Sequence, residues 1–268
     1  MVQRDIVHFK PYLKSITIMK PKGQALKEHP FDIPAVQAID TLEFHPDVTF
    51  LVGENGSGKS TILEAIAVAM EFGAQGGTGN FSMDDRDGLS KLHNFIRPKR
   101  SYQRPRDRYF LRAEGFYNIG VYLEDLWRDP DARTSREQAF RRYGGKSLHH
   151  RSHGESFMSL INDAFSGHGL YILDEPEAAL SPSRQLAALA RIHDLVRDQS
   201  QFIIATHSPI LMSYPNSKIY LLDQTGCRSV PFEQTEHLLI TRDFLNAYPK
   251  RLKQLLSNTP LLDLLEED

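Results

Sequence analysis

The feature that most constrains the fold is the stretch GENGSGKS at residues 53–60. It fits the pattern G-x-x-x-x-G-K-[ST] in full, directly after the apolar residues VTFLV and directly before STILEAIAVAMEF, whose apolar residues recur at helical spacing. The glycines let the backbone curl so that successive N–H groups point inward at a triphosphate, and the dipole of the following helix adds positive potential. The motif therefore predicts a strand, a phosphate-binding loop and a helix.

The residue types in this loop indicate a nucleoside triphosphate and Mg²⁺ as its ligands, without distinguishing kinases, GTPases and ATPases. We expect Lys59 to reach the β- and γ-phosphates and to act in catalysis, and the Ser60 hydroxyl to ligate Mg²⁺. The predicted nucleotide-binding residues of the loop are Gly53, Glu54, Asn55, Gly56, Ser57, Gly58, Lys59, Ser60 and Thr61.

A second motif, LYILDEP, places two adjacent carboxylates at the end of an apolar run. Open α/β sheets bind ligands at the carboxyl ends of their strands, so this pair is expected beside the phosphate loop. We expect Asp174 to hold Mg²⁺, directly or through water, and Glu175 to orient or deprotonate the attacking water. Together with the loop, the pair predicts an ATPase.

A third motif, THSP, follows the next apolar run, QFIIAT. A histidine just past a buried strand is more often a loop or capping residue. Because His207 comes one β-α unit after the double carboxylate, we instead expect it to hydrogen-bond a γ-phosphate oxygen and to report whether that phosphate is present.

The chain alternates between strand and helix patterns around these motifs. Strands are predicted over 13–19, 38–44, 48–53, 108–118, 170–174, 201–206 and 218–223, and helices over 60–72, 155–166 and 182–199. Strands that are apolar on both faces favour a mainly parallel sheet flanked by helices, with an antiparallel β portion at the N-terminal end. We expect one domain over 1–268, in which 73–150 is an insertion that forms a helical lobe and leads into the segment at 152–155.

The order of these motifs resembles that of the ABC-type P-loop ATPases. In that family a signature sequence heads a helix about twenty residues before the acidic pair, and Ser152 to Glu155 stand at that place. The resemblance implies that Ser152 and Gly154 bind the γ-phosphate of ATP held by a second subunit, so that two chains close as a homodimer around ATP. It also argues against a serine nucleophile in HGES, which lacks the second glycine of a nucleophile elbow.

Four positions relate less simply to this family. His153 replaces the first signature glycine, and Arg151 replaces the leucine. Glu114 is the best candidate for the family's glutamine loop, with an exposed strand-end acid as the alternative. Ser181, in the place of the family's inter-subunit loop, is a predicted helix N-cap.

Three functions stay open within the family. The glutamate in the signature and the long middle region favour a stand-alone head of the SMC/RecF-like, non-transporter group, acting in DNA repair, maintenance or defence. An ATP-gated module that controls a soluble protein partner, such as a nuclease or toxin, and an ATP-binding subunit of a membrane transporter are the alternatives. No apolar run reaches the roughly 20 residues that cross a bilayer, and one cysteine, Cys227, fits a reducing compartment, so a cytoplasmic protein without membrane insertion is expected.

A basic stretch runs from Arg97 to Arg108, in a chain with 32 Lys and Arg against 34 Asp and Glu. Its prolines argue against a helix, and Tyr102 could stack on a base. The stretch is either a contact for nucleic acid, made mainly to phosphates, or a solvated connector whose arginines pair with Asp84, Asp85 or Asp87.

Overall fold

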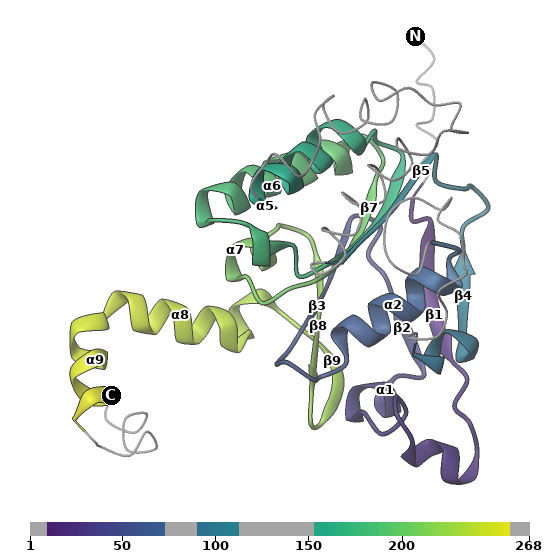
Figure 1. The fold of residues 1–268 in the computed structure, drawn as a ribbon, viewed down its shortest axis with the longest axis horizontal. Helices are drawn as coiled ribbons and strands as arrows, with labels where there is room; N and C mark the ends of the chain where they lie inside the picture. Colours follow the sequence, from purple (N-terminus) through teal and green to yellow (C-terminus); the bar gives the residue numbers. More distant parts are fainter. Residues whose placement is uncertain (1–9, 73–89, 113–152, 258–268) are drawn as a thin grey trace, which may run out of the picture.

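The computed structural model describes residues 10–72, 90–112 and 153–257, which form two β-sheets with helices on both sides of the larger one (Figure 1). In spatial order the larger sheet contains β5 (Asp107–Arg112), β6 (Gly169–Asp174), β7 (Gln201–Ala205), β3 (Val48–Val52), β8 (Lys218–Asp223) and β9 (Gly226–Val230). Neighbouring strands are parallel except for the last pair, β8 and β9. The carboxyl ends of the strands that precede the three motifs therefore lie at one edge.

The smaller sheet is antiparallel, with β1 (Leu13–Ile18) between β2 (Thr41–Glu43) and β4 (Ile96–Arg100). Pro98 lies within β4 opposite Ile16. A proline lacks the N–H that a central strand needs, and β4 is an edge strand, where this loss is tolerated.

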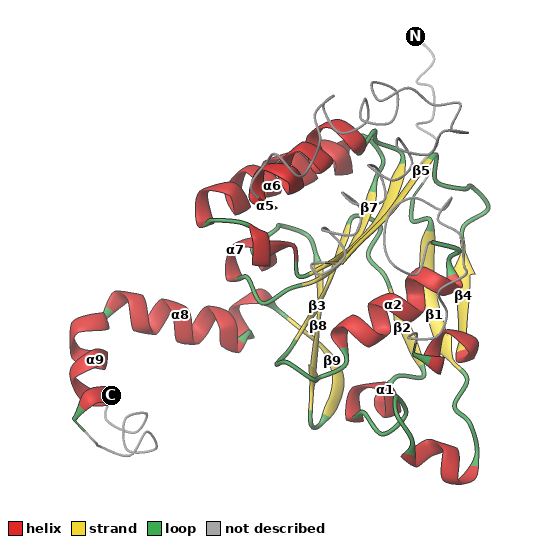
Figure 2. Ribbon diagram, in the orientation of Figure 1, coloured by secondary structure: helices red, strands yellow, loops and turns green. Residues whose placement is uncertain are grey.

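Helices cover both faces of the larger sheet. Helix α2 (Lys59–Ala69) lies on the face toward the smaller sheet, and helices α5 (His153–Ser159) and α6 (Pro182–Arg197) lie on the other (Figure 2). The remaining helices are α1 (Pro34–Ala38), α7 (Pro209–Met212), α8 (Glu236–Asn246) and α9 (Tyr248–Leu256). Short helical turns are η1 (Gly23–Lys27), η2 (Lys91–Phe95), η4 (Leu160–Ala164), η5 (Pro176–Ala179) and η6 (Phe232–Gln234).

Strand alternation explains why the sheet separates two hydrophobic cores. In β6, Tyr171 and Leu173 pack into the core under α5 and α6, whereas Leu170 and Ile172 pack into the core under α2. Successive side chains of a strand point to opposite faces, and all six residues of β6 are buried. A continuous apolar run is therefore what this strand needs, as the sequence indicated.

Helices α8 and α9 form an arm that projects from the body of the molecule (Figure 1). Neither helix has a buried residue. Arg251 joins the two helices, since its guanidinium donates to both carboxylate oxygens of Asp243 at 2.9 Å. Within the described ranges, no helix has the length and apolar character needed to cross a membrane.

The predicted α/β class with a mainly parallel sheet and an antiparallel N-terminal portion is confirmed. Two local expectations were wrong. The strand expected over 38–44 is only Thr41–Glu43, because Pro34 starts a helix that runs to Ala38. The basic stretch, which was expected to be a connector, contains the end of β4 and the start of β5. Ser181 stands at the N-cap of α6 as predicted, but its side chain makes no capping hydrogen bond.

Strands β4 and β5 fall inside the range 73–150, which we predicted to be an insertion, and each belongs to one of the two sheets. Much of that range, 73–89 and 113–150, lies outside the described residues. The division of the chain stays a prediction.

Candidate active site

The loop between β3 and α2 adopts a conformation that its glycines permit. Gly53, Gly56 and Gly58 have positive φ angles of 146°, 80° and 97°. At Gly53 a Cβ atom would lie 2.1 Å from the carbonyl oxygen of Leu222, so any side chain there would meet backbone. Glycine is therefore required both for the curl of the loop and for its approach to β8.

Lys59 lies folded across this loop at the start of α2. Its Nζ donates to the carbonyl oxygens of Gly53 and Glu54, both at 2.9 Å, and the side chain is buried. Burial lowers the pKa of Lys59, and nearby carboxylates, chiefly Glu175, oppose that shift. The ammonium group is thus held where the motif predicts the phosphates to bind.

Ser60 and Asp174 meet at the carboxyl edge of the sheet. The Ser60 hydroxyl donates to Oδ1 of Asp174 at 3.0 Å. Burial raises the pKa of Asp174 to about 6; the Ser60 hydrogen bond opposes the shift and the Glu175 charge adds to it. The two predicted metal ligands are therefore adjacent oxygen donors, and the charges of Arg112 and Lys59 offset the burial of the carboxylate only in part.

Glu175 and His207 face each other from the ends of β6 and β7. Nε2 of His207 lies 3.4 Å from Oε1 of Glu175. Glu175 has a positive φ of 49°, a conformation that L-residues adopt at a cost of about 1 kcal/mol. This turn directs the second carboxylate toward the histidine while the first one contacts Ser60.

The sequence reading missed His237 and Glu177, which also belong to this group. Nε2 of His237, in the first turn of α8, lies 3.2 Å from Nδ1 of His207, and a Glu177 carboxylate oxygen accepts from the backbone N–H of His207. An open pocket of about 500 Å³ is lined by Glu54, Asn55, Glu175, His207 and His237. His237 is a single histidine thirty residues after His207 and belongs to no motif, so the sequence did not indicate it. Glu177 lies two residues after Glu175, and this spacing could have indicated a residue of the site.

Burial, reinforced by the neighbouring His207, lowers the pKa of His237. His237 is therefore neutral at physiological pH, and it can accept or donate one hydrogen bond at each ring nitrogen depending on its tautomer. Its Nδ1 atom is buried without a hydrogen-bond partner in the described structure.

Arg112, the last described residue of β5, is a further residue that the sequence reading missed. It pairs with Asp174 in the strand register, and its guanidinium lies 3.1 Å from Oε2 of Glu64 on α2. A pocket of about 390 Å³ is lined by His29, Ser60, Thr61, Glu64, Ser90, Lys91 and Arg112. Glu114, our candidate for the glutamine loop, lies outside the described residues.

The signature-like segment is only partly described. Ser152 lies outside the described residues, and α5 begins at His153. Gly154 is packed so closely that a Cβ atom there would lie 2.6 Å from the carbonyl oxygen of Ala179 and 2.4 Å from Nη1 of Arg184. The start of α5 is therefore fitted against η5, the turn that follows the acidic pair.

The basic stretch is divided between bound and exposed side chains. Arg100 donates to the carbonyl oxygen of Ala69 at 2.6 Å and contacts Glu71 at 3.1 Å. The acids at 84, 85 and 87 lie outside the described residues. Tyr102 is 99% exposed, and Arg104 and Arg106 are also exposed. The arginines that could contact a partner are therefore fewer than the sequence suggested.

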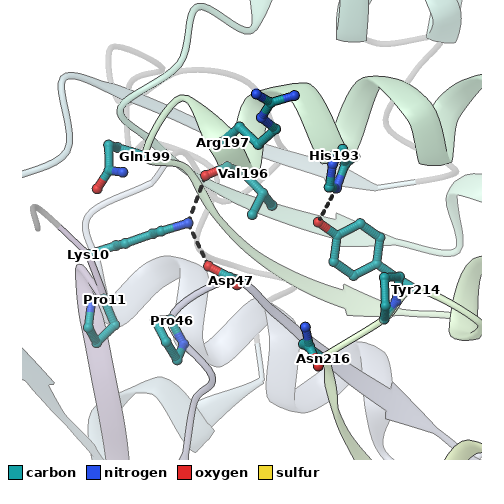
Figure 3. A pocket seen from close by; sticks show the side chains of 11 residues that line it. Lys10, Pro11, Pro46, Asp47, His193, Val196, Arg197, Gln199, Tyr214 and Asn216 are labelled. Carbon is teal, nitrogen blue, oxygen red and sulfur yellow. Dashed lines mark hydrogen bonds and ion pairs between the residues drawn. The ribbon is translucent and has the colours of Figure 1, made fainter.

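A second pocket, of about 540 Å³, lies at the amino ends of β3 and β7, away from the motifs. Lys10 lies between the carbonyl oxygen of Val196 at 2.7 Å and Asp47 at 2.5 Å, and His193 contacts the Tyr214 hydroxyl at 3.2 Å (Figure 3). Lys10 and His193 are therefore paired with protein groups, whereas Gln199, which also lines this pocket, has a buried Oε1 atom without a hydrogen-bond partner in the described structure.

Two protein-family models match the chain. The first, described as an AAA domain, matches residues 37–146, and the second, described as an AAA domain with the AbiEii toxin of a type IV toxin–antitoxin system, matches residues 157–213. The first contains the phosphate loop, and the second contains the acidic pair and His207.

Curated proteins that are similar to this chain are named as ABC transporter proteins. The chain is 27% identical over 226 residues to an ABC transporter ATP-binding protein of Streptomyces coelicolor, a match that covers 79% of this chain and 76% of that one. It is 26% identical over 190 residues to ABC transporter G family member STR2 of Medicago truncatula, covering 65% of this chain. The chain spans only 24% of the length of that plant protein.

Among solved structures, an ATP-binding cassette of an ABC transporter aligns with a TM-score of 0.50 and 16% identity, covering 89% of this chain and 99% of that chain. The similarity supports the fold that the order of strands and motifs had indicated.

Proposed function

We propose that the chain, which two AAA-domain models match, is a P-loop ATPase of the ABC type and uses ATP binding and hydrolysis to close and reopen a homodimer. The proposal rests on one observation: side chains that follow the ends of β3, β6 and β7 lie together at one edge of the sheet. Ser60 contacts Asp174 at 3.0 Å, and Glu175 faces His207 at 3.4 Å, beside the loop that Lys59 spans. These are the groups that phosphoryl transfer to water requires.

Each group has a chemical role in this proposal. Lys59 exchanges its two carbonyl contacts for oxygens of the β- and γ-phosphates, where its charge stabilises the transition state. Glu175 accepts a proton from the water that attacks the γ-phosphorus, and ADP leaves as the bond to its β-phosphate oxygen breaks. His207 donates from Nε2 to a γ-phosphate oxygen.

Mg²⁺ fits the donors that are present. Ser60 and Asp174 supply two adjacent oxygen atoms, and Mg²⁺ commonly takes one or two protein oxygens while water and phosphate complete its shell. When bound there, the cation would neutralise charge on the phosphates. The raised pKa of Asp174, about 6, supports this assignment because a cation would offset the burial of that carboxylate.

The shared site of the homodimer is the second part of the proposal. Gly154 lies at the N-terminal end of α5, where backbone N–H groups favour an anion. With Ser152, it would bind the γ-phosphate of ATP held by the partner chain. Gly154 packs closely on η5, the turn directly after Asp174 and Glu175. This packing supports the proposal that a change at the acidic pair also moves the start of α5.

The decisive experiment measures the association state by light scattering with no nucleotide, with ADP and with ATP, using Glu175→Gln to prevent turnover. We expect a dimer only in the presence of ATP, and a monomer with ADP or without nucleotide. A monomer under all three conditions, with ATP bound, would exclude ATP-gated dimerisation.

The exposed basic side chains favour nucleic acid as the target of this cycle, in DNA repair, maintenance or defence. Arg104, Arg106 and the fully exposed Tyr102 lie between β4 and β5, where they could contact phosphates and stack on a base.

A soluble protein partner is a second candidate, favoured by the family model whose description names a toxin–antitoxin system. The names of the curated relatives instead favour a transporter subunit. We place the protein in the cytoplasm, where ATP and Mg²⁺ are available. Purification with DNA, a soluble protein or a membrane protein separates the three candidates.

A further inference from the structure

The histidine pair at the active site joins two parts of the molecule that no sequence motif connects. His207 follows β7 in the body, and His237 lies in the first turn of the projecting helix α8. Their rings are 5.4 Å apart between centroids, with Nδ1 of His207 3.2 Å from Nε2 of His237. Both side chains line the open pocket beside Glu175.

The surroundings determine which nitrogen of His207 carries a proton. Nε2 of His207 lies 3.4 Å from a Glu175 oxygen, and a lone pair facing a carboxylate would be repelled. This repulsion favours the tautomer of His207 with its proton on Nε2, although Nε2 makes no hydrogen bond in the described structure. In the neutral ring Nδ1 then accepts a hydrogen bond, and the Nε2–H of His237 is the donor at that position. His237 thus stabilises the tautomer in which His207 presents an N–H toward the phosphate side.

Among the described residues, the same contact links the arm to the body. In α8 only His237, Leu238 and Phe244 are partly buried, and the other residues of the helix are exposed. The exposed residues include Leu239, Ile240 and Leu245, at 41%, 58% and 64% exposure. A shift of His207 would therefore act on α8 at its first turn, where the helix meets the active site.

We propose that His237 is a positioning residue for His207, and that this pair connects occupancy of the γ-phosphate site to the orientation of the α8–α9 arm. The proposal rests on the γ-phosphate contact proposed for His207 above. On binding ATP, His207 turns its N–H from Glu175 to the phosphate, and His237 follows through the shared hydrogen bond.

Enzyme kinetics test the positioning role. His237→Ala is expected to lower kcat about tenfold, which is what loss of one well-placed hydrogen bond gives, with ATP affinity and melting temperature unchanged. His237→Gln should restore most of the rate, because its amide nitrogen can occupy the place of Nε2 and donate to His207. The matched control is His193→Ala, which removes a histidine contact of the same 3.2 Å length in the second pocket and should leave kcat unchanged.

Hydrogen–deuterium exchange tests the connection to the arm. With Mg²⁺ and the non-hydrolysable analogue AMP-PNP, amides of residues 236–246 should exchange at rates different from those with ADP. His237→Ala should abolish that difference, and His193→Ala should retain it.

The outcomes separate this inference from the function on which it rests. If the wild type binds and hydrolyses ATP but His237→Ala keeps its kcat, or keeps the exchange difference in α8, the inference is wrong and the proposed function stands. If His237→Ala lowers kcat and Gln does not rescue it, the histidine is not acting as a donor to His207, which also overturns the proposal. If the wild type fails to bind ATP, the proposed function itself is wrong.

Discussion

The Ser60 hydroxyl donates a hydrogen bond to Oδ1 of Asp174 across 3.0 Å, although 114 residues separate the two along the chain. One belongs to the phosphate loop and the other ends β6, and the parallel register of β3, β7 and β6 brings them to one edge. This contact defines where the proposed cation would bind and leads to the first prediction.

Asp174→Asn should stabilise the nucleotide-free protein at pH 7.5, by about 1 to 3 kcal/mol in the free energy of unfolding. The folded-state pKa, about 6, lies above the ordinary value of 3.8, so burial of the charge costs stability above pH 6 and this cost fades as the pH falls toward 4. Urea unfolding of both proteins at pH 7.5 and pH 4 should show a difference that shrinks at the lower pH. An equal difference at both values would contradict the assignment.

Glu175→Gln should bind ATP with wild-type affinity and reduce turnover by about 100-fold or more, because a positioned general base contributes a factor of that size. Binding is measured by calorimetry and turnover by phosphate release. Glu177→Gln is the comparison variant. It makes the same change of carboxylate to amide, but at a residue that contacts the His207 backbone and is not assigned to the attacking water. Unchanged turnover in Glu175→Gln would remove this residue from the mechanism.

Mixed dimers test whether the site is shared between chains. Lys59→Ala and Ser152→Ala should each be inactive alone. Mixing them leaves one of the two sites of a mixed dimer with both an intact loop and an intact signature, so part of the ATPase rate should return, up to about a quarter of wild type if the chains mix at random and the sites act independently. Absence of any recovery, with both variants folded and binding each other, would count against a shared site.

Gly154→Ala should lower the free energy of unfolding by about 1 to 3 kcal/mol, because its Cβ would overlap the carbonyl oxygen of Ala179 as well as the Arg184 side chain. Adding Arg184→Ala should recover only part of the loss, since the backbone contact remains. Urea denaturation of the single and double variants gives both values, and a fully recovered double variant would show that Arg184 alone restricts this position.

Reversing the exposed charges at Arg104 and Arg106 to glutamate should abolish stimulation of the ATPase by DNA or RNA and leave basal turnover unchanged. Each lost phosphate contact should also reduce the slope of log affinity against log salt by about 0.9. Lys250→Glu with Lys253→Glu, on the exposed face of α9, is the matched control. Arg100 is left unchanged because it bonds to Ala69. Nucleic acid binding as tight as wild type at low salt would favour the protein-partner candidate.

The sequence by itself determined the parts whose chemistry is local. A curled phosphate loop needs glycines at particular positions, and Gly53, Gly56 and Gly58 have the positive φ angles that only such residues adopt freely. A strand buried on both faces needs a continuous apolar run, which β6 has. Because these requirements act on neighbours in the chain, the fold class and the elements that carry Lys59 and Asp174 could be predicted.

Tertiary structure decided the contacts between distant elements. The sequence around Pro98 did not predict that residues 96–100 would form a strand paired with β1, since a proline argues against a strand. The structure accepts it because β4 is an edge strand, in which the other residues make the backbone hydrogen bonds to β1. Arg112 meets Glu64, and His237 meets His207, only because sheet order and helix packing bring their elements together. A lone histidine or arginine has no periodicity or spacing to read, and its role depends on neighbours that the linear sequence leaves far away.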